Sequence, residues 1–205
     1  MKKNLLLWIF CLSGLLISCD KNQETFDFPV TLRAVKMVKN GDVRMFIGGK
    51  EQFDHAVLSK FTDTDFFKKQ EENLSGTMSF ESADNVVFNS NESLPFSVKK
   101  ENDVFLFYSS NSVITDNEYE GAQRFKFLKY RAPSEPLPSG KYRTSELRIG
   151  RGDYHSIELS YMAYEYHTSA LSRYSGTVFN ELNGDLSFLG DRDTLAVQSY
   201  KIHYK

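Results

Sequence analysis

The chain has 205 residues, with 25 lysines and arginines against 27 aspartates and glutamates, and only two cysteines. A formal charge of −2 gives no general attraction to nucleic acid, so we expect no nucleic-acid partner. Two cysteines are too few for a disulfide-rich scaffold or a four-thiolate zinc site, and a hydrophobic fraction of 40% is too high for a disordered chain. These values are typical of a folded globular domain.

The first eighteen residues have the pattern of a targeting signal. Lys2 and Lys3 form a positive start, and Leu5–Ile17 is a run without a charged side chain. A membrane-spanning helix needs about 20 apolar residues, so this run is too short to cross a bilayer. The sequence predicts a signal peptide over residues 1–18, a polar tether over residues 19–25 and a single β-rich domain over residues 26–205.

Leu16-Ile17-Ser18-Cys19 closes this run with a cysteine directly after a small residue. These four residues resemble the lipobox of bacterial lipoproteins, and the acidic flank beyond them is similar to signals in lipoproteins of the Bacteroidota. The resemblance implies cleavage before Cys19, acylation of Cys19 with fatty chains such as palmitate, and a lipid-anchored place in the cell envelope, where we expect the outer membrane. An ordinary secretory signal with a chance cysteine is the alternative. No family is identified for the mature domain.

Short β-like runs separated by turn residues dominate the mature chain. Asn40-Gly41 stands between the apolar runs Val30–Val38 and Val43–Ile47. Because a type I′ turn favours positive φ at both central positions, this pair predicts a β-hairpin. Glu101–Asp103 predicts a second hairpin turn further along the chain.

One segment has helical spacing. Phe53, Val57, Leu58 and Phe61 recur at i, i+4, i+5 and i+8, and Asp54 can cap the first turn of such a helix. From Gly76 onward only strands are expected. They are Thr77–Glu81, Asn85–Asn89, Phe96–Lys100, Val104–Ser109, Arg124–Tyr130, Tyr142–Ile149, Tyr154–His167, Ser172–Asn180, Leu186–Leu189 and Leu195–Tyr204.

An unbroken series of antiparallel strands with little helix is typical of a barrel or a sandwich. We therefore predict an all-β fold, either an antiparallel barrel or a sandwich, with one short helix. An up-and-down barrel resembles the lipocalins in architecture. The resemblance does not extend to the family, because the Gly-x-Trp of lipocalins is absent and Trp8 lies in the signal.

Metal sites and cofactors are not expected. The four histidines, His55, His155, His167 and His203, form neither H-x-H nor H-E-x-x-H. Asp63-x-Asp65 and Asp191-x-Asp193 lack the ligand spacing of an EF-hand loop. They are better interpreted as turn and cap residues.

No catalytic residue is predicted either. Asp153-Tyr154-His155-Ser156 contains the residue types of a nucleophilic triad, but neighbours on a strand point to opposite faces. Gly150-x-Gly152 lacks the third glycine and the helix of a dinucleotide site.

The most suggestive pattern lies on the predicted strand Tyr154–His167. Strand alternation puts Ile157, Leu159, Tyr161 and Ala163 on one face, which has the composition of a core. The other face mixes phenol, hydroxyl and carboxylate groups and suits a ligand-binding surface. Its candidate ligand-binding residues are Tyr154, Glu158, Met162, Tyr164 and Tyr166. Cross-strand tyrosine packing on a wetted sheet face is the structural alternative.

Together these features predict a membrane-anchored envelope lipoprotein whose β domain is a non-catalytic module that binds a glycan, a peptide or an envelope protein. Two alternatives remain open. A glycan-active hydrolase would need two carboxylates about 5–10 Å apart. A structural component of an envelope complex would need a large exposed apolar patch.

Overall fold

The computed structural model describes residues 26–62, 67, 76–90, 92–115, 126–132, 134–170 and 172–205, without the side chains of residues 60–62, 113 and 115. The predicted signal peptide, Cys19, the tether and Asp63-x-Asp65 lie outside these ranges. Within them the chain is almost entirely β-structure with a short helix, as predicted.

Eight strands close into an antiparallel barrel, which confirms the barrel alternative. Their spatial order is β10-β9-β7-β6-β5-β4-β1-β12, and β12 pairs back onto β10. The strands are β1 (Val30–Lys39), β4 (Thr77–Ser82), β5 (Asn85–Asn89), β6 (Ser93–Glu101), β7 (Val104–Thr115), β9 (Tyr142–Asp153), β10 (Ser156–His167) and β12 (Thr194–Tyr204).

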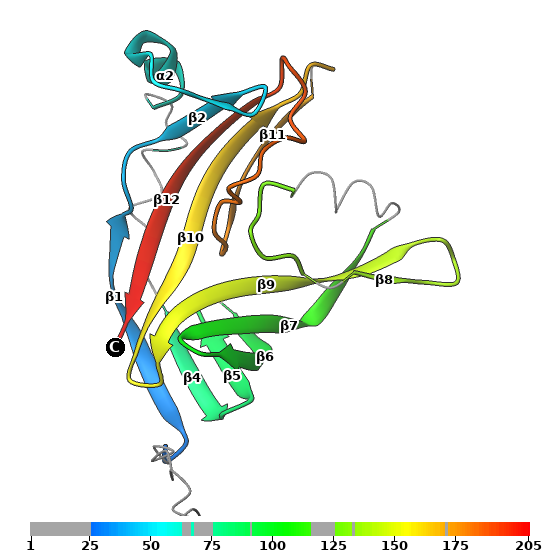
Figure 1. Cartoon of the computed structure of the whole chain (residues 1–205). Coiled ribbons are helices and arrows are strands. Elements are labelled where there is room, and N and C mark those ends of the chain that lie inside the picture. The colour runs from blue at the N-terminus through cyan, green and yellow to red at the C-terminus, as the bar shows by residue number, and fades with distance from the viewer. Residues whose placement is uncertain are drawn as a thin grey trace, which may run out of the picture.

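Strands β10 and β12 continue side by side beyond the barrel and carry a second, open sheet (Figure 1). We call this sheet, with the order β11-β10-β12-β2-β3, the extension sheet. A short helix lies beside β2 at this end of the molecule, and β8 pairs with β9 on the barrel side (Figure 1). These elements are β2 (Arg44–Ile47), β3 (Lys50–Gln52), α2 (His55–Thr62), β8 (Ser134–Pro136) and β11 (Arg173–Val178).

The predicted hairpin at Asn40-Gly41 was wrong. β1 and β2 both pair antiparallel with the same long strand, β12, so they run in the same direction and residues 40–43 form a break between them. Pairing with β12 prevails over the local turn signal because it satisfies the backbone of β12 and buries Phe46. The tight hairpin comes later, where Gly48 and Gly49, both with positive φ, join β2 to β3.

Three predicted strands have different bounds or a different structure. The strand predicted from Tyr154 begins at Ser156, because the two residues before it form the turn between β9 and β10. Leu186–Leu189 is a loop with a turn, and residues 126–130 are a turn segment with an isolated bridge from Leu128 to Leu182. These segments are apolar because they cover a sheet, not because they belong to one.

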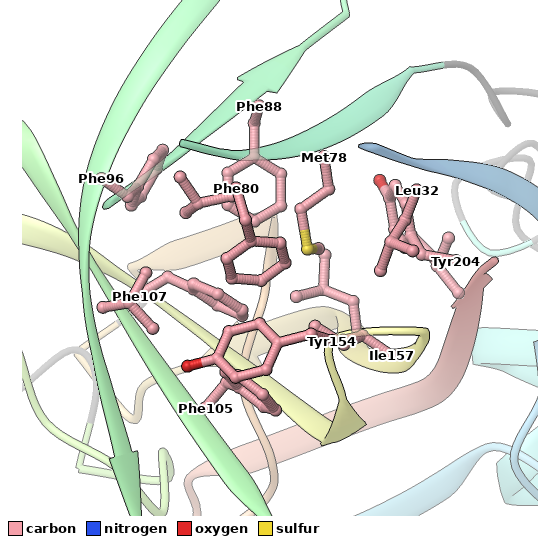
Figure 2. Packing of buried hydrophobic residues seen from close by; sticks show 14 residues of the cluster. Leu32, Met78, Phe80, Phe88, Phe96, Phe105, Phe107, Tyr154, Ile157 and Tyr204 are labelled. Carbon is pink, nitrogen blue, oxygen red and sulfur yellow. The ribbon is translucent and has the colours of Figure 1, made fainter. Parts of the chain in front are cut away.

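Aromatic side chains fill the barrel (Figure 2). The rings of Phe80, Phe105 and Phe107 are fully buried, with centroids between 5.9 and 6.2 Å apart. Tyr154 enters the same core from its turn, edge-on to Phe80 at 5.1 Å and to Phe105 at 5.2 Å. The barrel interior is therefore a side-chain core, as in other small eight-stranded barrels. Its other buried members are Leu32, Met78, Val86, Phe88, Phe96, Val98, Ile157, Leu159, Ile202 and Tyr204.

Buried residues cover both faces of the extension sheet. On the opposite face from α2, a second core combines sheet residues with the apolar loop residues Phe127, Leu186 and Leu189. On the α2 face, Phe67 packs with Ala163, Ala196 and Tyr200. The sheet side of the second core consists of Phe46, Met162, Tyr164, Tyr166, Leu195 and Val197.

A polar clip fastens the loops of the second core to the barrel wall. The Asn180 side chain donates to the carbonyl of Tyr130 at 2.8 Å and accepts from the Tyr130 and Glu181 amides. The Glu181 carboxylate accepts from Arg151 Nε at 3.0 Å and from Lys129 Nζ at 2.8 Å. Burial acts to raise the pKa of Glu181, but these hydrogen bonds outweigh it and hold the pKa below its ordinary value.

Candidate functional site

The five residues predicted to bind a ligand lie in three different places. Tyr154 belongs to the barrel core, whereas Met162, Tyr164 and Tyr166 belong to the second core, each no more than 8% exposed. Glu158 lies on the outer wall of the barrel. The structure therefore does not bring the five side chains together on one open surface.

Tyr166 shows why the tyrosines of β10 suit a second core. Its hydroxyl donates to Asp193 Oδ2 at 3.1 Å, and the same carboxylate accepts the backbone amides of Ser169 at 2.7 Å and Gly190 at 3.1 Å. Burial, reinforced by the Asp193 charge, raises the pKa of Tyr166 to about 12. Asp193, from the predicted turn motif Asp191-x-Asp193, thus organises a loop around a buried phenol.

Glu158 takes part in an ion-pair cluster on the barrel wall. It faces Lys201, which donates to its carboxylate, and His203, whose Nδ1 lies 3.4 Å from Oε1. The Lys201 hydrogen bond holds the pKa of Glu158 below its ordinary value. Both partners come from β12, so this cluster ties the closing pair of the barrel and leaves Glu158 partly exposed.

A cleft of about 390 Å³ opens at the end of the molecule that carries α2. It lies between α2, the break at residues 40–43 and β12. Among its described lining residues, the sequence pointed individually to His55 and Leu58, and to neither of them for ligand binding. The described lining residues are Lys39, Asp42, Val43, His55, Leu58, Ser59, Phe67 and Gln198.

Gln198 is the most deeply buried polar side chain of the cleft, with 3% of its surface exposed. Its Nε2 donates to the carbonyl of Gly41 at 2.9 Å and to the carbonyl of Ser199 at 3.1 Å. Both amide protons are thereby used, so Oε1 is the atom available to accept a hydrogen bond from a ligand. Reversing the amide would set Oε1 against two carbonyl oxygens, so the backbone determines its orientation.

The break between β1 and β2 explains this geometry. The amide of Asn40 still donates to the carbonyl of Ser199 at 2.9 Å, but the chain then leaves β12, and the Gln198 side chain satisfies the carbonyl of Gly41 instead. Gly41 has φ of +82°, a conformation that glycine adopts without strain. The chain departs from the sheet here and leaves the space of the cleft beside Asp42.

The helix α2 forms the opposite wall. Asp54 Oδ1 accepts the amide of Ala56 at 2.8 Å, and the Asp54 carbonyl accepts the amide of Leu58 at 2.9 Å. Asp54 is therefore the N-cap that the sequence predicted. The first two turns present His55, Leu58 and Ser59 to the cleft.

The chemistry of the described lining limits what the cleft can do. Asp42 is the one carboxylate among those residues, so they do not provide the pair that a glycosidase needs. Across the described ranges, no group of three or more histidine, cysteine, aspartate or glutamate side chains is placed to hold a metal ion. No helix within those ranges has the length and hydrophobicity to cross a membrane.

Comparison with protein-family models found no match for this chain. Comparisons with curated proteins and with solved structures found no match either.

Proposed function

We propose that this chain is a lipid-anchored protein of the bacterial cell envelope, in the outer membrane, whose β domain binds a small ligand in the cleft without catalysing a reaction. The observation that carries the binding role is the buried Gln198, whose amide the backbone orients with Oε1 left to accept. A buried polar group with an unused acceptor in a cleft is suited to a ligand that donates. The anchoring is proposed from the lipobox residues Leu16–Cys19.

The two parts of this proposal fit one orientation. The described chain starts at Phe26, whose ring contacts Tyr154 at 4.8 Å and His155 at 5.1 Å, at the turn between β9 and β10. From this end β1 runs towards the end that carries α2 (Figure 1). Its ten residues rise about 3.3 Å each, so Lys39, which lines the cleft, is about 30 Å away. An anchored Cys19 followed by six residues, which reach about 20 Å at most, would keep the turn end near the bilayer, with the cleft at the far end of β1.

The alternatives have less support. A glycan hydrolase would need two carboxylates, but Asp42 is the one carboxylate among the described lining residues of the cleft. For a structural component, the large apolar side chains that are exposed in the described part of the chain are scattered over β1, the link between β3 and α2, and β7, and do not form one extensive patch. They are Val35, Val38, Phe53 and Ile114.

Lipid anchoring is tested by feeding cells an alkyne-bearing fatty acid and detecting its incorporation. The full-length protein should carry the label and sediment with membranes, whereas Cys19→Ala should lose the label and be released in soluble form. Cys11→Ala is the matched control, because Cys11 precedes the cleavage site and should leave labelling unchanged. A wild-type protein that stays unlabelled and in the aqueous fraction would contradict the anchor.

The binding role is tested separately, on the purified full-length protein in detergent micelles. Saturation-transfer NMR on small sugars and dipeptides, with calorimetric titration for inorganic phosphate, should detect binding of at least one member of this panel. The bound compound should itself remain chemically unchanged after prolonged incubation with the protein. Conversion of the bound compound to products would favour the hydrolase instead.

A further inference from the structure

The described lining residues of the cleft carry balanced charge. Lys39 and Asp42 bring one positive and one negative side chain, and both are exposed at the rim. A phosphate or carboxylate that approaches Lys39 also meets Asp42, and an ammonium group meets the reverse problem. A neutral ligand has neither conflict.

The deepest polar group is also uncharged. Gln198 is almost fully buried, whereas His55 at the edge of the cleft is exposed. A charged ligand group placed against the Gln198 amide would lose water without gaining a counter-ion, which is costly. An uncharged donor such as a hydroxyl gains a hydrogen bond there without that cost.

The described lining of the cleft contains both hydrogen-bond donors and acceptors. Asp42 and Gln198 Oε1 accept, and the ammonium of Lys39 donates. The Ser59 hydroxyl donates to the carbonyl of Ala56 at 3.1 Å. Each hydroxyl of a polyhydroxylated ring is both a donor and an acceptor, so neighbouring hydroxyls suit a lining of this mixed kind.

The cleft also offers apolar surface and the right size. Val43 and Leu58 are partly buried side chains of its wall, next to the buried Phe67. The carbon-bound hydrogens of a sugar ring supply a matching apolar face. A volume of about 390 Å³ is at the lower end of the range of small-ligand sites, about 300–1,000 Å³.

We propose that the cleft binds a neutral saccharide of one or two rings, with a ring hydroxyl donating to Gln198 Oε1 and a second hydroxyl donating to Asp42. This inference rests on the proposed binding function and names the chemical class of its ligand. The sugar lies at the α2 end, remote from the filled barrel core.

The test uses saturation-transfer NMR and calorimetric titration of the full-length protein in micelles. The probes are glucose, galactose, mannose, N-acetylglucosamine and their β-linked disaccharides, with glycylglycine and inorganic phosphate as the charged comparisons. At least one sugar should bind, and Gln198→Leu should weaken it about tenfold or more, because it removes the buried acceptor.

Asp42→Asn provides a second variant that leaves the fold intact, since Asp42 is exposed in the break. It retains the shape of the side chain and removes its charge, so sugar affinity should fall several-fold. Asp27→Asn is the matched control, because Asp27 is an exposed carboxylate near the opposite end of β1, and it should bind like the wild type.

The outcomes separate the two proposals. Sugar binding that both cleft variants weaken and Asp27→Asn does not would support the saccharide. If glycylglycine or phosphate binds with the same dependence on the variants and no sugar binds, the saccharide proposal is overturned. The binding role of the cleft is retained in that case. No bound probe, or binding that ignores Asp42 and Gln198, would overturn both.

Discussion

The barrel and the extension sheet share strands β10 and β12, but the pattern of buried residues along these strands differs between the two regions. In the barrel, β10 alternates, with Ile157 and Leu159 fully buried and Glu158 and Ser160 partly exposed. Beyond Tyr161 the same strand is buried at every position from Met162 to Tyr166. β12 shows the mirror pattern, continuous from Leu195 to Gln198 and alternating towards Tyr204.

The difference follows from the number of covered faces. A barrel wall has one dry side, so every second residue is buried. The extension sheet is covered on both sides, so consecutive residues are buried whatever their polarity. This explains why Glu165 is only 2% exposed and pairs with Arg173 at 3.1 Å, and why Gln198 depends on backbone carbonyls. The fully covered stretches of β10 and β12 thus hold the polar residues Glu165 and Gln198 in the interior, and the cleft lies beside the second of them.

The largest expected effect concerns the barrel. Phe105→Ala removes a fully buried ring and should lower the free energy of unfolding by about 3–5 kcal/mol, whereas Leu186→Ala, on a loop that can settle inward, should cost about 2 kcal/mol. Urea denaturation followed by circular dichroism measures both. Equal losses would show that the second core is packed as rigidly as the barrel.

A smaller effect is expected inside the second core. Tyr166→Phe keeps the ring and removes the hydroxyl that donates to Asp193, so the free energy of unfolding should fall by about 1–2 kcal/mol. Spectrophotometric titration of the folded proteins near 295 nm should show that the variant lacks a phenol of pKa about 12. If both proteins titrate identically, the buried phenol described above is contradicted.

The smallest effect is a pH dependence that originates in the polar clip. The pKa of Glu181 is lower in the folded protein than its ordinary value of 4.5. The ionised carboxylate therefore stabilises the fold above pH 4.5, and this stabilisation is lost as the pH falls through the folded pKa. Glu181→Gln should therefore be less stable at neutral pH and should lose less stability on acidification. Unfolding midpoints of both proteins at neutral and acidic pH provide the measurement. An unchanged acid slope would show that the clip does not depend on this charge.

Local chemistry predicted several features that the structure confirms. A tight turn joins β6 to β7 at Glu101–Asp103, as predicted, and Asn102 adopts positive φ in it. Asp54 caps the helix, and the alternating runs form antiparallel strands. Each of these depends on residues within a few positions of one another.

The cleft could not be predicted in this way. Gln198 and Gly41 are 157 positions apart, and nothing in either neighbourhood indicates that one completes the hydrogen bonds of the other. The tyrosine face of β10 was predicted to be an open surface but is buried in the second core, for a related reason. Alternation shows which residues share a face, but it does not show that loops containing Phe127 and Leu189 cover that face.

The sequence by itself determined an all-β fold with a short helix, because hydrophobic period and capping act over short distances, and its signal motif predicts a lipid anchor. Only the tertiary structure decided which strands close the barrel, which faces are covered and where the chain leaves the sheet to form a cleft. Those outcomes depend on contacts between distant segments competing for the edges of β10 and β12, and no local pattern records that competition.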